Sequence, residues 1–227
     1  MHRKENIQMK IAIDGPAGAG KSSIAKLAAK ELGFIYIDTG AMYRAAALYA
    51  ISNGIEICEK SFTKEVLDKI KIDIKYDESG QIILLCGEDV SKRIREADVS
   101  LGASNIAVIP AVRLKLVDLQ RELAAGNNVI MDGRDIGTYV LPDAELKIYL
   151  TASVDERATR RVKELIEKGQ TADFEQVKKD IAYRDKNDSE REFAPLRQAE
   201  DAILIDSTNM TIDEVKNRIL SLAKEKM

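Results

Sequence analysis

One short glycine-rich segment carries the residue types that bind phosphate. Residues 15–22 read Gly-Pro-Ala-Gly-Ala-Gly-Lys-Ser, between an apolar run that ends at Asp14 and a helix-like run that begins at Ser23. Glycines let the backbone wrap closely around a phosphate, so that successive N–H groups point inward as donors. The next helix adds its positive end, Lys21 a cation for the β- and γ-phosphates, and Ser22 a hydroxyl ligand for Mg²⁺. The segment predicts a bound nucleoside triphosphate; a plain turn is the alternative.

A second charged group follows a later apolar run. The run 129–131 leads directly into Asp-Gly-Arg-Asp at 132–135. Three charged residues packed around a glycine at a strand end do not serve a core. Asp132 stands where a strand ends in a carboxylate, which is the position that helps to hold Mg²⁺ in many phosphate-loop enzymes.

Residues 38–44, Asp-Thr-Gly-Ala-Met-Tyr-Arg, follow another apolar run and lead into a helical pattern. In an open α/β sheet, ligands bind at the C-terminal ends of the strands, so this segment is expected to face the phosphate loop across a crevice. Arg44 stands about one turn inside the helix and can bind a phosphate through two parallel hydrogen bonds. Taken alone, a solvated surface arginine is the alternative.

More arginines recur at helical spacing later in the chain. Arg157, Arg160 and Arg161 share one face at spacings of three and four. Arg184 and Arg191 are seven residues apart with Asp188 between them, again on one face if the helix continues. Charged helical faces are usually only solvated surface. Together with Arg44 and Arg134, in an acidic chain that has a phosphate loop, these arginines predict a site that neutralises more phosphate than one triphosphate carries.

The elements that position these residues alternate between strand and helix, which is typical of a parallel sheet wrapped by helices. Short apolar runs suited to buried parallel strands lie at 9–14, 34–38, 129–132, 146–150 and 202–206. The helix after the phosphate loop has Ile24, Leu27 and Ala28 on its apolar face and Gly33 where a C-cap belongs. A second helix is predicted over 41–52, ending near Gly54.

Three further helix starts follow from capping signals. Pro110 opens a helix that Gly126 closes; its apolar face is predicted to hold Val112, Leu116, Leu119 and Leu123. The runs Ser-Val-Asp-Glu at 153–156 and Thr-Ile-Asp-Glu at 211–214 both fit the capping box, each just after a predicted strand.

One stretch breaks the alternation. Strand-like runs at 72–76 and 81–85, joined by Asp-Glu-Ser-Gly at 77–80, predict an antiparallel hairpin. With the segment 63–70 before it, this stretch is expected to form a subdomain over about 60–105, inserted in a single domain that spans 1–227. The alternative is that this stretch is an extension of the sheet without a functional role.

Composition bounds the classes of protein. A chain of 227 residues can bury a sizeable core without disulfides or metals. Its formal charge of −3 gives no global basic field, which argues against a dedicated nucleic-acid binder. Cys58 and Cys86 lack metal-ligand spacing, and the polar start lacks the apolar stretch of a signal peptide. We expect a cytoplasmic protein with no membrane partner.

Motifs of the other phosphate-loop classes are missing. The chain has no guanine-reading Asn-Lys-x-Asp and no transporter signature loop, and it is short for a motor. These absences favour a small-molecule kinase.

The segments above resemble the bacterial-type cytidylate kinases, a branch of the nucleoside monophosphate kinases, over nearly the whole chain. The matching motifs are Ile-Asp-Gly-Pro-Ala-Gly-Ala-Gly-Lys-Ser at 13–22, Asp-Thr-Gly-Ala-Met-Tyr-Arg at 38–44, Gly-Glu-Asp-Val at 87–90, Asp-Gly-Arg-Asp-Ile-Gly-Thr at 132–138 and Glu-Arg-Ala-x-Arg-Arg at 156–161, with Ala-Pro-Leu and Asp-Ser-Thr near the end. Thr39 stands where many relatives have serine, and Ser22-Ser23 replaces a more usual pair, but neither departure removes a needed hydroxyl.

The resemblance implies an α/β fold of the P-loop NTPase type, a parallel sheet flanked by helices, with a small mixed α/β insert containing the antiparallel hairpin and a helical lid at 153–170. It implies transfer of the γ-phosphoryl group of ATP to CMP or dCMP with Mg²⁺, held through Ser22 and ATP. Apart from the resemblance, we expect a monomer that binds no nucleic acid. The insert would be the monophosphate-binding subdomain.

The resemblance also implies site roles. The catalytic residues would be Lys21, Asp132, Arg134, Arg157 and Arg161. ATP would be bound by Gly15, Pro16, Ala17, Gly18, Ala19, Gly20, Lys21, Ser22, Ser23, Arg157 and Arg160. CMP would be bound by Thr39, Tyr43, Arg44, Ser104, Arg113, Asp132, Arg134, Asp135, Arg184, Asp188 and Arg191. Within this set, Arg44, Arg134 and Arg191 would clamp the phosphate, and Arg184 and Asp188 would contact the sugar.

The chemistry of the base agrees with three of these positions. Ser104, Arg113 and Asp135 match the base-reading positions of the family. Cytosine offers an amino donor at N4 and an acceptor at N3, and uracil reverses both. A carboxylate at Asp135 can accept from N4, and a guanidinium at Arg113 can donate toward N3 and O2, so uracil would leave buried groups unpaired. A structural salt bridge between Arg113 and Asp135 is the alternative.

Two other functions stay open at this point. One is a kinase for another small acceptor, such as UMP or a hydroxylated metabolite. The other is a nucleotide-dependent switch or RNA-binding regulator that does not turn over an acceptor, although the chain lacks interleaved aromatic and basic residues and switch motifs.

Overall fold

The computed structural model of the protein describes residues 8–77, 80–167 and 169–227. The polar start of the chain, two residues of the hairpin turn expected at 77–80 and residue 168 of the expected lid therefore lie outside the described residues.

Five parallel strands form the central sheet, in the order β2-β6-β1-β7-β8. They are β1 (Lys10–Asp14), β2 (Ile35–Asp38), β6 (Val129–Gly133), β7 (Leu146–Thr151) and β8 (Ile203–Asp206). Each coincides with a predicted run to within one residue at either end. In the register, Asp38 of β2 lies beside Asp132 of β6, and Asp14 of β1 lies beside Gly133. The sequence places a carboxylate at three neighbouring strand ends, and the sheet brings them to one edge.

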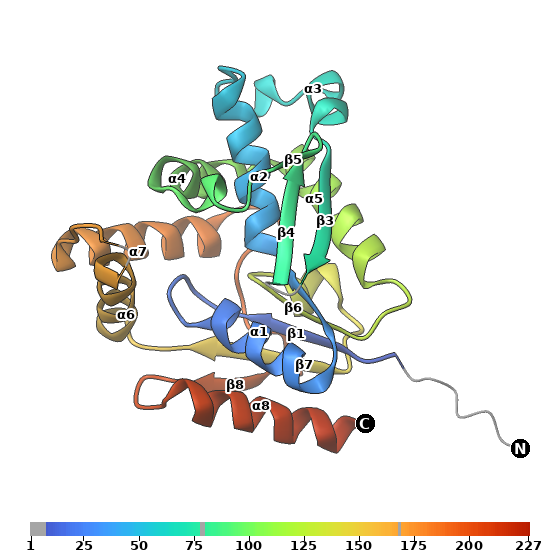
Figure 1. The fold of residues 1–227 in the computed structure, drawn as a ribbon, viewed down its shortest axis with the longest axis vertical. Helices are drawn as coiled ribbons and strands as arrows, with labels where there is room; N and C mark the ends of the chain where they lie inside the picture. The colour runs from blue at the N-terminus through green and yellow to red at the C-terminus, as the bar shows by residue number, and fades with distance from the viewer. Residues whose placement is uncertain (1–7, 78–79, 168) are drawn as a thin grey trace, which may run out of the picture.

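Helices cover both faces of this sheet (Figure 1). On one face, α1 (Lys21–Leu32) and α8 (Ile212–Lys226) pack on Ile11, Ile13 and Ile130. On the other, α2 (Thr39–Ser52) and α5 (Pro110–Ala124) pack over Ala12 and Met131. Successive side chains of a strand point to opposite faces, so the continuous apolar runs of β1 and β6 feed both layers of core.

Helix ends follow the predicted signals closely. Gly33 ends α1 in the left-handed conformation, and Thr211 begins α8 with a complete capping box to Glu214. One buried-face assignment is wrong: Leu27 is 43% exposed, because α1 buries Ala25 and Ala29 beside Ile24 and Ala28 instead.

The second predicted capping box forms only by half. The Ser153 hydroxyl accepts from the Glu156 N–H at 3.2 Å, and α6 (Val154–Glu167) starts where predicted. The Glu156 carboxylate pairs with Arg160 at 2.8 Å instead of turning back, because the Ser153 N–H already donates to Thr208. Thr208, from the segment after β8, takes the place of the reciprocal cap.

The predicted hairpin is present in an insert above the sheet (Figure 1). Strand β3 (Ile72–Asp77) pairs antiparallel with β4 (Gly80–Leu85), and β4 pairs with the short β5 (Glu88–Asp89). The rest of the insert consists of the 3₁₀ turn η1 (Glu59–Ser61), helix α3 (Lys64–Lys69), the 3₁₀ turn η2 (Arg93–Arg95) and helix α4 (Ala97–Ile106), which packs along α2.

Two helices project beside the phosphate-loop end of the sheet, at the left of Figure 1. Helix α6 packs against α7 (Phe174–Glu190) through a small core of Ala158, Val177 and Ile181. Asp173 caps α7 by accepting from the Gln176 N–H. The helix continues through Asp188, as the spacing of Arg184 and Asp188 requires, and ends immediately before Arg191.

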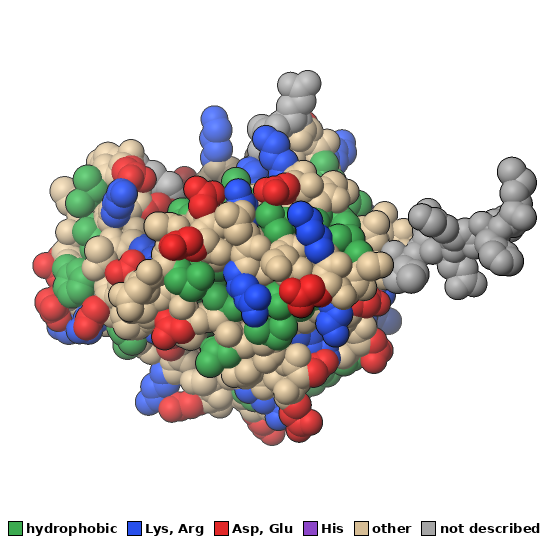
Figure 2. Space-filling model, turned by 90° about the horizontal axis from the view of Figure 1, so that it is seen from below, with side chains coloured by type: hydrophobic (Ala, Val, Ile, Leu, Met, Phe, Trp, Pro, Cys, Tyr) green, Lys and Arg blue, Asp and Glu red, His purple; other side chains and the backbone are tan. Residues whose placement is uncertain are grey.

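Within the described ranges, no single helix is long and apolar enough to cross a membrane. Helices α4 and α5 pass that test only together, with a 100° bend between them. On the face seen from below, basic and acidic side chains are interspersed (Figure 2).

Candidate active site

The phosphate loop between β1 and α1 has a backbone that only glycine fits at two positions. Gly15 has a φ of +150°, and a Cβ there would meet the Leu150 carbonyl oxygen at 1.9 Å. Gly18 has a φ of +76° and lies against Arg157. Gly20 is left-handed and forms the N-cap of α1, whose first residue is Lys21. The sequence therefore folds here into a loop packed between β7 and α6.

Lys21 is held inside this loop. Its Nζ donates to the carbonyl oxygens of Gly15 and Pro16, both at 2.7 Å. Burial and the neighbouring Arg134 together lower the pKa of Lys21 to about 7, against the opposing charge of Asp132. The ammonium is therefore a poorly solvated cation beside other positive charge, which an anion would stabilise.

Asp132 joins the loop to the end of β6. Its Oδ2 accepts from the Ser22 hydroxyl at 2.8 Å, its Oδ1 from the Tyr36 hydroxyl at 2.9 Å, and its backbone carbonyl from Thr39 at 2.7 Å. Burial raises the pKa of Asp132, and the adjacent Asp38 raises it further. Tyr36 was not identified from the sequence, because a tyrosine inside a strand run carries no signal of its own.

The donor set at Asp132 suits Mg²⁺. Hydroxyl and carboxylate oxygens are the hard ligands that this ion prefers, with phosphate and water completing its shell. Among the residues that the structure describes, no group of three or more His, Cys, Asp or Glu could hold a metal. Ser22 and Asp132 each offer one such oxygen where the phosphate loop meets the end of β6.

Asp14, at the end of β1, fixes the segment after β6. It accepts from the Ile136 N–H at 2.8 Å and from the Gly137 N–H at 2.7 Å. Burial raises the pKa of Asp14 to about 6, although the two N–H groups oppose the shift. These bonds fix the backbone next to Asp135. Sequence reasoning missed this role, although Asp14 ends an apolar run as Asp132 does.

Asp38, at the end of β2, is bound from two sides. Its Oδ1 caps α2 by accepting from the Ala41 N–H, and Arg44 Nη2 lies 3.1 Å from its Oδ2. Arg95, from η2 of the insert, donates to the same Oδ2 at 2.8 Å. Burial alone would raise the pKa of Asp38, but the two guanidiniums lower it below the usual value. Neither Asp38 nor Arg95 was assigned a role from the sequence.

A chain of ion pairs connects the other predicted acceptor residues. Arg134 Nε donates to Asp188 Oδ2 at 2.6 Å, and Arg191 lies 3.6 Å from the other oxygen of Asp188. Arg191 also pairs with Asp135 at 3.2 Å, and Arg113 pairs with Asp135 at 2.5 Å. The salt bridge considered for Arg113 and Asp135 is therefore present, and it belongs to a network that reaches the strand end at β6.

The base-side residues surround Arg113, which is fully buried. Its guanidinium lies 5.4 Å from the centre of the Tyr43 ring and also donates to the Ala107 carbonyl at 3.0 Å. Burial raises the pKa of Tyr43 to about 12. Ser104, on α4, accepts from the Asn187 side chain at 3.4 Å. Helices α2, α4, α5 and α7 thus bring these residues toward one another.

Arg184 has no ion pair or hydrogen bond with another described residue. Burial lowers its pKa, and the like charges of Arg134, Arg161 and Arg44 lower it further, with Asp188 as the opposing carboxylate. Four arginines from α2, the end of β6, α6 and α7 therefore lie near one another, and of these four only Arg184 has no carboxylate partner of its own among the described residues.

The three arginines of α6 have different partners. Arg157 is buried and donates to the Ala17 carbonyl at 2.8 Å, with Asp185 at 2.7 Å. Arg160 turns to the Ser207 carbonyl at 2.6 Å. Arg161 pairs with Glu164 at 2.7 Å, on the side that faces Arg184. Of these three arginines, only Arg157 forms a hydrogen bond with the phosphate loop among the described residues. Ser23 lies exposed on α1.

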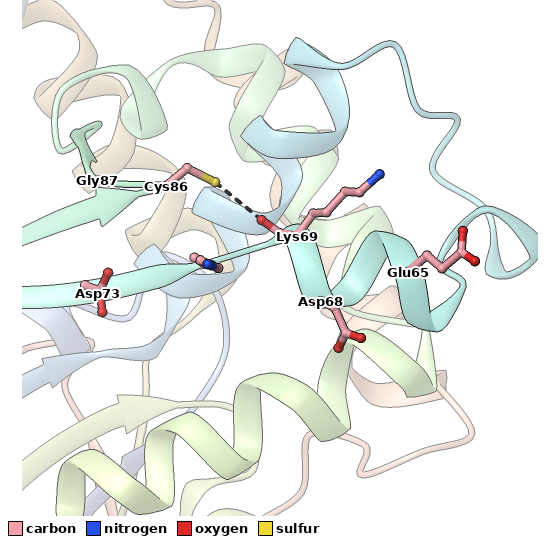
Figure 3. Close-up of a pocket in the computed structure, with 7 residues that line it drawn as sticks. Glu65, Asp68, Lys69, Asp73, Cys86 and Gly87 are labelled. Atoms are coloured by element: carbon pink, nitrogen blue, oxygen red, sulfur yellow. Dashed lines mark hydrogen bonds between the residues drawn. The ribbon is translucent and has the colours of Figure 1, made fainter.

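A surface hollow of about 650 Å³ lies outside this site (Figure 3). It is formed by α3 and the strand ends of the insert, where the Cys86 Sγ donates to the Lys69 carbonyl. None of its lining residues belongs to the predicted site. Its mixed charges, among them Asp68, Lys71 and Asp73, do not favour one kind of ligand.

Comparison with known proteins gives one family. A sequence model of the family described as "Cytidylate kinase" matches residues 11–225. A cytidylate kinase of Caldicellulosiruptor saccharolyticus is 57% identical over 215 residues, covering 95% of this chain and 95% of that protein. One of Anoxybacillus flavithermus is 50% identical, covering 97% and 98%.

A solved structure shares the fold. An uncharacterised protein from Eubacterium ventriosum aligns with a TM-score of 0.54 at 16% identity, over 96% of this chain and 99% of that one. At this identity the likeness concerns the fold alone, which is a parallel sheet between helices in both proteins.

Proposed function

Because the chain belongs to the cytidylate kinase family, it transfers the γ-phosphoryl group of ATP to CMP or dCMP, and we propose that the site described above carries out this transfer. The products are ADP and CDP or dCDP. One observation carries the assignment of the site: Arg184, without a carboxylate partner of its own among the described residues, lies near Arg134, Arg161 and Arg44. Arg134 in turn lies near Lys21 of the phosphate loop, and Arg44 lies near Asp132.

The triphosphate binds to the phosphate loop in this proposal. The backbone N–H groups of 15–20 and the N-terminus of α1 point their partial charges at phosphate oxygens. Lys21 exchanges its two carbonyl partners for the β- and γ-phosphates, which restores the charged form that burial disfavours. Arg157 supports the loop from behind through Ala17.

Ser22 and Asp132 would hold Mg²⁺ beside the triphosphate. When bound, the ion would neutralise the negative charge that develops on the phosphate oxygens during transfer. Tyr36 occupies the second oxygen of Asp132, so the carboxylate is oriented before any ligand arrives. The Ser22 hydroxyl needs only to turn its proton away from Asp132 to present a lone pair.

The acceptor phosphate binds to Arg44, Arg134 and Arg191, with Arg184 and Asp188 at the sugar. Each clamp arginine has a carboxylate partner, so the phosphate dianion replaces one ion pair by another instead of meeting a bare cation. No general base is required, because a phosphate oxygen is already an anionic nucleophile. The protein contributes alignment and charge neutralisation.

Cytosine is read by Asp135 and Arg113, with Ser104 beside them. Both charged side chains are buried and already oriented by the Arg113–Asp135 bond. Arg113 Nε is buried without a hydrogen-bond partner among the described residues, so it has a donor available for a base. Helices α6 and α7 then close as the lid, and Arg161 approaches the transferring group while water is excluded.

We further propose that the enzyme acts as a monomer in the cytoplasm, where ATP and nucleoside monophosphates are both present. Light scattering on the purified protein measures the oligomeric state directly, and a dimer would contradict this part of the proposal.

ATP-dependent formation of diphosphate, measured side by side with CMP, dCMP, UMP and AMP, tests the function. We expect CMP and dCMP to be the best acceptors by at least tenfold in kcat/KM, since uracil mismatches both base-reading groups by about 1–3 kcal/mol. Faster turnover of UMP or AMP would overturn the assignment of the acceptor. Salt-dependent RNA retention without CMP-stimulated ADP release would overturn the enzyme itself.

A further inference from the structure

Asp38 is the residue where the insert meets the core. The insert reaches it twice: the Gln81 side chain of β4 accepts from the Asp38 N–H at 2.9 Å, and Arg95 of η2 donates to the Asp38 carboxylate at 2.8 Å. Gln81 and Arg95 lie 43 and 57 residues away from Asp38 in the sequence. The insert thus binds both the backbone and the buried carboxylate of Asp38, and the reaction scheme above gives these two contacts no role.

The two arginines of η2 differ sharply in what they contact. Arg93 pairs with Asp98 at 2.7 Å and Glu96 at 3.1 Å, both within the insert and both exposed. Arg95 pairs across to Asp38, whose side chain is 5% exposed. Asp132 and Tyr36, deeper in the cleft, also act on its charge. Of the two arginines of η2, only Arg95 therefore forms an ion pair with a residue of the candidate site among the described residues.

Arg44 and Arg95 pair with the same carboxylate, that of Asp38, and this matters when Arg44 binds a phosphate. Arg44 shares Asp38 with Arg95, and its Nε is buried without a hydrogen-bond partner among the described residues. To bind an acceptor phosphate, Arg44 must loosen its bond to Asp38. A buried carboxylate without a counterion is costly, and it would repel a dianionic phosphate placed beside it.

We infer that Arg95 is a positioning residue: it keeps Asp38 neutralised while Arg44 binds the phosphate of the acceptor nucleotide. The inference rests on the proposed function of Arg44. It assigns the insert a part in phosphate binding without direct contact to the phosphate, and Asp38 is the group through which it acts.

This arrangement predicts for which ligands the binding affinity depends on Arg95. The nucleoside cytidine has no phosphate, so its affinity does not depend on the freedom of Arg44. The affinity for CMP does depend on it. Once CMP is saturating, the clamp is formed, and kcat changes little.

The test measures the Kd of CMP and of cytidine by calorimetry for the wild type and for Arg95→Ala, with Arg93→Ala as the matched control. We expect Arg95→Ala to weaken CMP by about tenfold, the loss of one charge-assisted bond, with cytidine and kcat within threefold. Arg93→Ala is expected to stay within twofold throughout. Equal effects of the two variants on CMP would overturn the inference.

A double-mutant cycle with Asp38→Asn separates positioning from direct contact. Asn still caps α2, but it carries no charge for Arg95 to balance. If Arg95 acts through Asp38, adding Arg95→Ala to Asp38→Asn changes the Kd of CMP by less than twofold. If the tenfold effect persists there, Arg95 contacts the phosphate itself and the positioning role is wrong.

Two controls separate a loss of stability from a loss of CMP binding, and failure of this inference from failure of the proposed function. Should Arg95→Ala prove unstable by thermal unfolding, Arg95→Lys and Arg95→Gln replace it, and the charged variant is expected to bind CMP better. A wild-type protein that neither binds nor phosphorylates CMP contradicts the proposed function. A wild type that does both, with Arg95 variants unchanged, contradicts only this inference.

Discussion

The Ser22 hydroxyl donates to the Asp132 carboxylate across 2.8 Å, and this bond joins two segments 110 residues apart. It connects the first turn of α1 to the end of β6, where the phosphate loop and the charged strand end meet. The parallel pairing of β1 with β6 places the two segments side by side. The oxygen pair is therefore built by the sheet rather than by local sequence.

Asp132→Asn should raise the Mg²⁺ concentration that gives half-maximal activity by about tenfold and lower kcat by about a hundredfold. Asn keeps the shape and can still accept from a hydroxyl, but it has no charge for a cation. Tyr36→Phe, which removes one bond to the same carboxylate, should have a smaller effect. Calorimetric titration of ATP with and without Mg²⁺ supplies a readout separate from turnover. An unchanged gain in ATP affinity from Mg²⁺ would contradict this role.

Lys21→Ala should reduce kcat by on the order of a thousandfold while the fold stays intact. Among the described residues, its Nζ forms hydrogen bonds only with carbonyls of the loop itself, so no bond to a distant element of the described structure is lost. Circular dichroism and thermal unfolding check the fold, and steady-state kinetics check the rate. Lys30→Ala, at an exposed position of the same helix, is the matched control and should change neither. Retention of most activity by Lys21→Ala would count heavily against the scheme.

Affinity for the triphosphate should fall as pH rises above 7. The pKa of Lys21 is about 7 before binding, because burial and Arg134 disfavour its charge. A phosphate beside the ammonium favours the charged form, so the pKa rises on binding and the complex takes up a proton above pH 7. The affinity should therefore drop by up to about tenfold per pH unit between pH 7.5 and 9.

Calorimetry in buffers of different ionisation enthalpy measures this proton uptake. Lys21→Arg keeps its charge throughout that range and should bind without uptake. Equal affinity of the wild type at pH 7.5 and 9 would place the pKa of Lys21 elsewhere.

The elements were predictable because their signals are local. Buried parallel strands need continuous apolar runs, and all five runs were present, four of them with a carboxylate at or next to the end. The same carboxylate signal that marked Asp132 stood at Asp14 and Asp38, so these two could have been found. Their partners could not. The bond of Arg95 to Asp38 depends on how the insert folds back on β2, and no spacing rule contains that.

The arginines show the same division. We predicted that the arginines converge because helical spacing and the ends of apolar runs can both be read from the local sequence. Their ion partners were not, because Arg134 meets Asp188 only after α7 packs across the strand end. The cap at Ser153 was not predictable for the same reason: its backbone N–H donates to Thr208, a residue far along the chain, instead of to Glu156.

Asp135→Asn should narrow the preference for CMP over UMP, since the amide can both donate and accept. It should also lower the free energy of unfolding by about 3 kcal/mol, because Arg113 and Arg191 both lose their buried counterion. Urea unfolding and acceptor kinetics measure the two effects separately. A large loss of stability with an unchanged CMP/UMP ratio would leave Asp135 with a structural role alone.

Gly15→Ala adds only a methyl group, but it should abolish ATP binding by the phosphate loop and destabilise the fold. At a φ of +150°, an added Cβ would lie 1.9 Å from the Leu150 carbonyl oxygen, and that oxygen belongs to the backbone of a central strand that cannot give way. Gly33→Ala is the matched control, since Gly33 also has a positive φ, +69°, but nothing lies within 4 Å of its Cβ position. The control should lose about 1 kcal/mol of stability and keep its ATP affinity. Gly15→Ala should lose measurable ATP binding and several kcal/mol in urea unfolding, because the loop and β7 must separate. Equal losses in the two variants would mean that backbone conformation alone, rather than the close approach to β7, requires glycine at position 15.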